Sequence, residues 1–225
     1  MGEELLFGDY NLDTLLLREK LRVSESFDII ERHLTVCDAD MCFFYIDGFV
    51  KDAELLRIMQ FLLSEKSIDS AEVLERRIPY AEVELCREPK KLIRAVLSGQ
   101  TAILAESFGP VAILLDLRTY PARPTSEPEG DRVMQGARDG FVETLVTNTA
   151  LIRRRIRDTR LTMEHFNLGG SSETDVVVCY MKGMADEDTV RDVKRKISSI
   201  KPKSLLALMV RTQPATVTCL ASIEA

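Results

Sequence analysis

Apolar residues recur every three or four positions near the N-terminus and then give way to a nearly continuous apolar run. Over residues 11–36 this spacing predicts two helices, with Ser24 or Ser26 as a plausible N-cap of the second. The next segment, MCFFYIDGFV, predicts a strand that is buried on both faces and ends at Gly48. Apolar residues over 52–64 then predict a helix. A buried strand followed by a helix is typical of α/β architecture.

The same alternation returns after Pro79. AEVELCR predicts a strand, and EPKKLIRAVLSG predicts a helix with Pro89 near its first turn and Gly99 as its C-cap. TAILAE and VAILLDLRTY flank four turn residues, which predicts a β-hairpin. These elements would form a mixed sheet covered by helices and ending near Tyr120.

A stretch rich in chain breakers separates these elements from the rest of the chain. Pro121, Pro124, Pro128 and Gly130 are spaced through polar residues without an apolar period, which predicts a linker or an exposed loop. A chain of 225 residues accommodates two domains of about 100 residues each. We therefore expect N-terminal helices over 1–36, a first α/β subdomain over 37–120, a linker over 121–136, a second α/β subdomain over 137–210 and an atypical tail over 211–225.

The second half begins with a predicted amphipathic helix. Phe141, Leu145, Ile152 and Ile156 follow helical spacing, and arginines occupy the rest of the helix surface. LTMEHFNLG and TDVVVCYMKG predict two strands, residues 186–200 a helix, and SLLALMV a final strand. The predicted fold class is α/β: two small subdomains, each a mixed β-sheet packed with α-helices, joined by a Pro/Gly-rich linker.

Charge and composition narrow the possible partners. The net charge of -6 argues against a general nucleic-acid binder, which would be basic. The five cysteines are odd in number and lack a C-x-x-C pair, which favours buried thiols in a reducing compartment. The longest apolar runs have six residues, against roughly 20 needed to span a bilayer. No secretory signal opens the sequence, so the chain as given is expected to be soluble.

The sequence contains no recognisable enzymatic motif. It lacks both G-x-x-x-x-G-K-[ST] and G-x-G-x-x-G, so nucleotide binding has no support. The two histidines, His33 and His165, lie far apart without a metal-ligand pattern. Carboxylates such as Asp38, Asp40 and Asp47 are interpreted as solvated residues at strand ends and turns. We therefore expect no enzyme activity, no cofactor and no metal site.

A cluster of arginines is the strongest functional signal. Five guanidinium groups fall within eight residues. A solvated face, ion pairs with carboxylates of the same or a neighbouring subunit, and contact with anionic lipid or nucleic acid would each explain the cluster. Because arginine forms bidentate carboxylate pairs, we expect this face to organise the domain or an oligomer interface. The interface candidates are Arg153, Arg154, Arg155, Arg157, Arg160, Arg138 and Glu143, and the linker or cleft candidates are Arg118, Tyr120 and Arg123.

Several long segments of the sequence resemble those of one known family. FFYIDGFVKD, IPYAEVE, LIRAVLSGQTAIL, DLRTYPAR, GARDGFVETLVTNTALIRRRIRD and GGSSETDVVVCYMKGMAD occur in the family's order and together cover about residues 41–200. They resemble the A subunits of bacterial spore germinant receptors, the GerA family, and within it most closely the stage V sporulation protein AF branch. The hallmark of this family is DGFVE followed by N-x-x-L-I-R-R-R-I.

The resemblance implies a soluble N-terminal region of two α/β subdomains at the spore inner membrane, facing the spore core. Family members act in nutrient-triggered germination as membrane complexes, proposed to be oligomeric ion channels. The implied partners are further copies of the chain and other germination membrane proteins, without nucleic acid. The leading interpretation is a non-enzymatic regulatory and assembly domain. The alternative is a module that binds a small-molecule germinant in the cleft between the subdomains, near Tyr120 and Arg123.

The C-terminal end departs from the family. Family members continue into membrane helices, whereas this sequence ends at Ala225 and from about Val210 no longer resembles the family's approach to the membrane. An artificial end, a truncated gene product and a frameshift would each produce such a sequence. If the membrane part is missing, channel function cannot reside in this chain alone.

Overall fold

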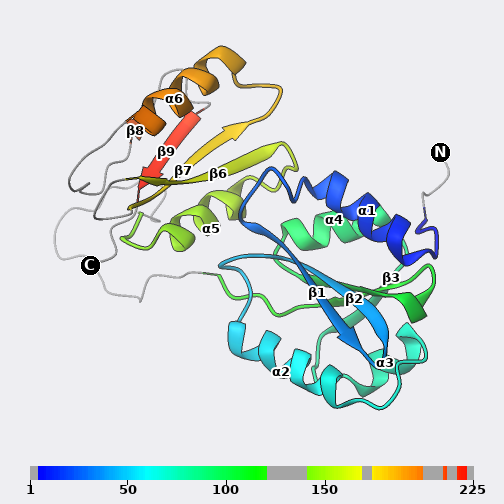
Figure 1. Cartoon of the computed structure of the whole chain (residues 1–225). Helices are drawn as coiled ribbons and strands as arrows, with labels where there is room; N and C mark the ends of the chain where they lie inside the picture. The colour runs from blue at the N-terminus through cyan, green and yellow to red at the C-terminus, as the bar shows by residue number, and fades with distance from the viewer. Residues whose placement is uncertain (1–4, 121–140, 169–173, 200–209, 212–216, 222–225) are drawn as a thin grey trace, which may run out of the picture.

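Two β-sheets, each covered by helices on both faces, organise the chain (Figure 1). The computed structural model describes residues 5–120, 141–168, 174–199, 210–211 and 217–221. The first sheet has the strand order β1-β2-β4-β5-β3, and the second has the order β6-β7-β9-β8. The predicted fold class, two small α/β subdomains, is confirmed. The predicted linker, residues 121–136, lies outside the described residues.

The first sheet contains β1 (Ile29–Val36), β2 (Ala39–Ile46), β3 (Val83–Cys86), β4 (Thr101–Ala105) and β5 (Ala112–Leu115). Helix α4 (Pro89–Leu97) connects β3 to β4, and β5 lies between these two strands, antiparallel to each. The strand–helix–strand pattern is therefore a crossover between strands that point the same way but are not neighbours. All pairings of neighbouring strands in the sheet are antiparallel, which refines the expected mixed sheet.

The prediction of a second helix before residue 37 is wrong. Helix α1 (Tyr10–Leu21) ends at Arg22, which adopts a left-handed conformation, and residues 29–36 form strand β1. A two-residue turn at Cys37 and Asp38, with φ of 51° and 61°, folds β1 back onto β2. The β1 sequence is rich in β-branched residues and pairs along its whole length with apolar β2. This pairing outweighs the weak helical spacing of the segment.

Helices cover both faces of the first sheet. Side chains of β2 alternate, so that Cys42 and Phe44 pack in the cluster under α1 and α4, whereas Met41 and Phe43 pack in the cluster under α2 (Asp52–Ser64) and α3 (Ala71–Arg77). The short 3-10 helix η1 (Glu106–Phe108) lies in the turn between β4 and β5. This arrangement gives the first subdomain a helix–sheet–helix layering.

The predicted ends of helix α4 hold closely. Pro89 occupies the first turn of the helix, where a backbone N–H would have no acceptor within the helix, so the lack of an N–H in proline costs no hydrogen bond. Ser98 is the C-cap, and Gly99 follows it with φ of 100°. A Cβ at Gly99 would lie 2.9 Å from Phe49 Cδ2, so a close approach adds to the conformational requirement for glycine. The glycine therefore acts one position later than predicted.

The second subdomain contains α5 (Leu145–Arg155), β6 (Leu161–Leu168), β7 (Thr174–Met181), α6 (Glu187–Ser199), β8 (Val210–Arg211) and β9 (Val217–Ala221). Val177 and Cys179 of β7 pack with Leu145 of α5, and Val176 and Val178 pack with residues of α6. The two helices therefore cover opposite faces of the sheet. Strand β9 lies between β7 and β8, within the residues expected to form an atypical tail.

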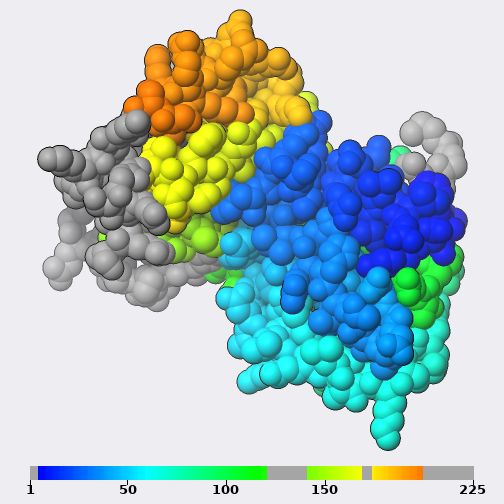
Figure 2. Space-filling model, viewed as in Figure 1, coloured from blue at the N-terminus to red at the C-terminus, as the bar shows by residue number. Residues whose placement is uncertain are grey.

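The two subdomains contact each other through the segment that precedes β1. Figure 2 shows this blue segment packed against the yellow surface of β6. The Phe27 N–H donates to the Met163 carbonyl at 3.0 Å, and the Met163 N–H donates to Ser26 Oγ at 3.0 Å. Phe27 also packs against the apolar cluster beneath α5. The N-terminal segment is thus bonded to both sheets.

Candidate functional site: an arginine interface between the subdomains

Arg153 lies fully buried between the two subdomains. Its guanidinium forms a bidentate pair with the Asp28 carboxylate, with Nε–Oδ2 at 2.7 Å and Nη2–Oδ1 at 2.9 Å. Nη2 also donates to Ser26 Oγ and to the Leu161 carbonyl, each at 3.1 Å. Nη1 donates to the Asp158 carbonyl at 3.1 Å. A planar fork with several fixed acceptors is the geometry in which arginine is favoured over lysine.

The acceptor side of this pair is itself held in place. Ser26 and Asp28 are 2% and 1% exposed, and Ser26 Oγ donates to Asp28 Oδ1 at 2.6 Å. The Asp28 carbonyl accepts from the Asp47 N–H at 2.8 Å, which ties the segment to the end of β2. A buried charge is strongly destabilising unless a partner compensates it. Removal of either Arg153 or Asp28 would therefore leave an unpaired charge in the interior.

The burial of Arg153 corrects the expectation that it lies on the helix surface. Val146, Ala150 and Arg153 follow one another at intervals of four and three residues, so they lie on one face of α5. Ala150 belongs to the apolar cluster of the first subdomain. Leu145 and Ile152 instead pack under the second sheet. Helix α5 therefore has two buried faces, one for each subdomain.

Gly48 allows the turn after β2 to approach this first face of α5. It has φ of 77°, and a Cβ at this position would lie 2.9 Å from Val146 Cγ1 and 3.2 Å from Ala150 Cβ. Any larger residue would need both a left-handed backbone and extra space. The turn after β2 and this face of α5 are therefore in close contact at Gly48.

Arg154 contacts the first subdomain through Tyr120. Its guanidinium lies 4.7 Å from the centre of the Tyr120 ring, and the ring packs edge-on against Phe49 at 5.3 Å. The Tyr120 hydroxyl donates to the Ser98 carbonyl at 2.8 Å. Arg118, another predicted cleft residue, pairs with Asp116 and lowers the pKa of that carboxyl. Both side chains are thus engaged within the protein.

The other predicted residues have different surroundings. Arg160 pairs with Asp158 at 2.6 Å on the surface, and Arg157 is exposed. Arg155 and Glu143 each interact with a neighbouring group. Arg138 and Arg123 lie outside the described residues. Phe141 and Ile156, expected on the apolar face of the helix, precede and follow α5 and are 44% and 37% exposed. Sequence reasoning gave Ser26 another role, as a helix N-cap, whereas its hydroxyl bonds to Asp28 and Arg153. Asp28, which carries no motif, was missed.

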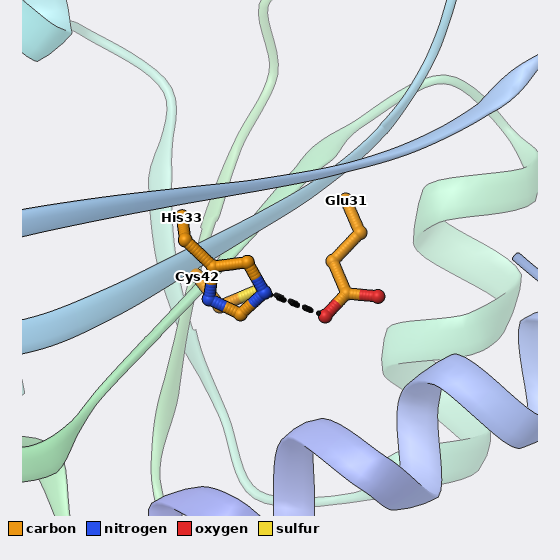
Figure 3. A group of neighbouring side chains, drawn as sticks. All are labelled: Glu31, His33 and Cys42. Atoms are coloured by element: carbon orange, nitrogen blue, oxygen red, sulfur yellow. Dashed lines mark hydrogen bonds and ion pairs between the residues drawn. The ribbon is translucent and has the colours of Figure 1, made fainter.

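A second polar cluster lies between α1 and the first sheet (Figure 3). The Glu31 carboxylate accepts from Arg18 Nε at 2.8 Å, from Arg18 Nη2 at 2.6 Å and from His33 Nε2 at 2.8 Å. Cys42 Sγ lies 3.8 Å from Glu31 Oε1. Burial raises the pKa of the Glu31 carboxyl, but the hydrogen bonds from Arg18 and His33 outweigh this effect and hold that pKa below the ordinary range of a glutamate.

This cluster is the one group of potential metal ligands among the described residues, with its donor atoms within 4.8 Å of one another. A metal ion would have to displace the Arg18 guanidinium from Glu31 and remove the proton of Cys42. Burial raises the pKa of that thiol well above its ordinary value, which opposes its ionisation. The arrangement is therefore better explained as a hydrogen-bonded support for α1 than as a metal centre.

Two hollows lie beside the junction of the subdomains. One, of about 380 Å³, is lined by Lys91, Arg94, Ala95, Ser98 and Arg157. The other, of about 520 Å³, lies along the N-terminal segment and β6 and is lined by Ser24, Glu25, Ser26, Phe27, Glu164, His165, Phe166, Tyr180 and Lys182. Lys182 and Glu25, which both line the second hollow, pair at 2.8 Å. The charged residues that line the first hollow are all positive.

Comparison with known proteins identifies the family of this chain. The family described as Bacillus/Clostridium GerA spore germination protein matches residues 16–210. The chain belongs to the GerA family. The predicted resemblance is therefore confirmed. Within the part of the chain that the structure describes, no helix is both long enough and apolar enough to cross a bilayer.

Individual relatives are spore proteins. Stage V sporulation protein AF of Bacillus subtilis is 36% identical over 81% of this chain and 38% of its own length. Spore germination protein KA of B. subtilis is 27% identical over 83% of the chain and 36% of its own length. The chain thus spans well under half of these relatives. Its fold matches the N-terminal domain of the A subunit of the Bacillus megaterium germinant receptor GerK3, with a TM-score of 0.69, 17% identity and coverage of 98% and 97% of the two chains.

Proposed function

We propose that this GerA-family chain is the non-enzymatic regulatory and assembly region of a spore germination membrane protein. In this proposal the contacts of α5 with the first subdomain fix the relative orientation of the two subdomains. The two subdomains in this orientation together form the surface that assembles with other subunits. The observation that carries the proposal is the burial of Arg153, 0% exposed and paired with Asp28 across the junction.

A buried ion pair of this kind favours specificity of arrangement. Desolvation of two charges offsets most of their attraction, so an apolar pair of similar size would stabilise a protein as well or better. An ion pair, however, tolerates only the arrangement in which both charges find their partners. We infer that Arg153 selects one orientation of the subdomains, and that a change in this orientation is the regulatory signal passed to the rest of the protein.

The proposal extends to the whole protein through its relatives. The region that this chain matches makes up 38%, 32% and 36% of three relatives, and one of them is named a membrane protein. We propose that the region described here is attached to the spore inner membrane on the core side, that it forms homo-oligomers with its own copies and assembles with other germination proteins, and that ion release takes place through the membrane part of the complex.

Germination of spores that carry altered genes tests this function. Arg153→Met removes the charge, and Arg153→Lys keeps the charge without the bidentate fork. Arg160→Met is the matched control, because Arg160 pairs on the surface within its own loop. Protein level, crosslinked complexes and the germination rate are measured together. We expect both Arg153 variants to reduce crosslinking and germination severalfold while Arg160→Met leaves them unchanged.

Two results would contradict the proposal. One is normal assembly and germination with Arg153→Lys and Arg153→Met at normal protein levels. The other is loss of germination with intact assembly and an unchanged subdomain orientation in crosslinking. If Arg153→Met lowers the protein level, the comparison between Arg153→Lys and the Arg160 control decides the outcome.

The alternative function, germinant binding in a cleft near Tyr120, has less support from the geometry. The Tyr120 ring lies between Phe49 and Arg154, and its hydroxyl is bonded to Ser98. Arg118 is likewise paired with Asp116. These contacts favour a packing role for both residues. A thermal shift of the chain by any nutrient in a panel of amino acids and sugars, lost on Tyr120→Leu, would reverse this order of preference.

A further inference from the structure

A cationic hollow lies where helix α4 meets the end of α5. Lys91, Arg94 and Ser98 succeed one another at intervals of three and four residues, so they line one face of α4 and its C-cap. Arg157, two residues after the end of α5, closes the hollow from the second subdomain. Figure 1 shows the C-terminal end of α5 directed toward α4. The hollow is therefore complete only when the two subdomains are docked.

The positive charges of this hollow are incompletely matched. Lys91 pairs with Glu84. Arg94 and Arg157 are exposed, and neither side chain forms an ion pair or hydrogen bond with any residue in the described part of the chain. Arg118, Arg153 and Arg160, by contrast, all have carboxylate partners. Because like charges in a hollow repel one another and raise the local potential, this site attracts an anion.

We propose that this hollow binds a small phosphate-bearing ligand, either inorganic phosphate or the phosphate monoester of a small metabolite. A phosphate group carries about -1.5 to -2 charges at neutral pH, which matches two unpaired guanidinium groups. A monocarboxylate would leave one of them uncompensated. Arginine forks bind phosphate oxygens in bidentate fashion. The volume of about 380 Å³ falls within the range of small-molecule sites and leaves room for more than the phosphate alone.

The site goes beyond the assembly role and connects with it. Arg157 follows the buried Arg153 by four residues, and Arg94 belongs to the helix whose C-cap residue, Ser98, accepts a hydrogen bond from Tyr120 through its carbonyl. A ligand bridging Arg94 and Arg157 would be attached to both subdomains at once. Because such a ligand binds only the docked arrangement, it stabilises that arrangement by mass action.

Binding of inorganic phosphate to the 225-residue chain tests the proposal. Calorimetric titration and thermal unfolding are carried out with phosphate, acetate and chloride at equal ionic strength. The variants are Arg94→Gln and Arg157→Gln. Arg76→Gln is the matched control, because Arg76 is an exposed arginine of α3 that is also without a partner among the described residues. Vesicles of phosphatidylglycerol form a separate arm that tests a lipid source of phosphate.

We expect saturable phosphate binding and a rise in Tm that acetate and chloride do not reproduce. Loss of one charge-assisted hydrogen-bonding group should weaken phosphate binding about tenfold or more in Arg94→Gln and in Arg157→Gln. Arg76→Gln should bind as the parent does. Equal effects of phosphate and acetate, equal affinities of Arg94→Gln and Arg76→Gln, or binding to vesicles without binding to phosphate would each overturn the proposal. The Tm of each variant is also measured without ligand. Because the replaced arginines are exposed, each variant should have the Tm of the parent.

Discussion

The Arg153 guanidinium and the Asp28 carboxylate form a bidentate ion pair across 125 residues of sequence, and their side chains are 0% and 1% exposed. Arg153 lies on α5 of the second subdomain, and Asp28 directly precedes β1 of the first. The pair joins the two units at a point where each is already packed by apolar residues. This contact connects the arginine cluster of α5 to the packing of the first subdomain.

Loss of either member of this pair should be strongly destabilising. Arg153→Met leaves the Asp28 charge buried, and Asp28→Asn leaves the Arg153 charge buried, so each variant should lower the free energy of unfolding by about 3–5 kcal/mol. Arg160→Met removes a half-exposed arginine from a surface pair and should change the same quantity by less than about 1 kcal/mol. Urea unfolding measures all three. Comparable values for Arg153→Met and Arg160→Met would argue that Arg153 is not buried in solution.

The close approach at Gly48 can be separated from its backbone conformation. Gly48 and Gly183 have similar φ, 77° and 76°, but a Cβ at Gly183 meets no atom within 4 Å. Gly183→Ala should therefore lower the free energy of unfolding only by the conformational strain, about 1 kcal/mol. Gly48→Ala should lower it by about 1–3 kcal/mol more, because Val146 and Ala150 of α5 must move. Equal losses in the two variants would contradict the tight interface.

The Glu31 cluster should contribute to the pH dependence of stability. The pKa of the Glu31 carboxyl in the folded protein lies below the ordinary range of a glutamate. The stabilisation from this carboxylate is therefore fully present above its unfolded-state pKa and is lost as the pH falls through its folded-state pKa. Glu31→Gln should lower stability near pH 7, and its difference from the parent should shrink below about pH 4. Unfolding free energies measured from pH 3 to pH 7 test this, with the exposed Glu19→Gln as control. A difference that grows toward low pH would have the wrong sign.

The cysteines of the described chain should differ sharply in reactivity. Cys37 is exposed in the β1–β2 turn, whereas Cys42 and Cys86 are buried. Burial raises the pKa of both buried thiols, so little thiolate is available at neutral pH. Maleimide should label Cys37 within the native protein and should reach Cys42 and Cys86 only after unfolding. Peptide mass spectrometry reads out the order, and rapid native labelling of Cys42 would contradict the fold of the first sheet.

Local patterns in the sequence predict most of the fold. The apolar run of β2, the helix that begins at Pro89 and ends just before Gly99, and the paired strands β6 and β7 each have a strong local signal. Strand β1 was predicted as a helix because its apolar residues also fit helical spacing, and only pairing with β2 decides between the two. Strand β9 was missed for a similar reason, since its place beside β7 depends on contacts with residues about 40 positions earlier.

The site was predictable only in part. The arginine cluster marked the correct helix, but three consecutive arginines give no local indication that Arg153 alone turns inward. A signal was present in Val146, Ala150 and Arg153, whose spacing defines a second buried face beside the one containing Leu145 and Ile152. The partner Asp28 could not be identified, because a pair separated by 125 residues is specified by packing of the whole fold.

A double-mutant cycle between Arg153 and Asp28 tests the central claim most directly. The free energies of unfolding of the parent, Arg153→Met, Asp28→Asn and the double variant are measured by urea titration of the same chain. Because each single change leaves an unpaired buried group, the double variant should be far less destabilised than the sum of the singles, with a coupling energy of about 2 kcal/mol or more. A coupling energy near zero would show that the two residues do not hold the subdomains together.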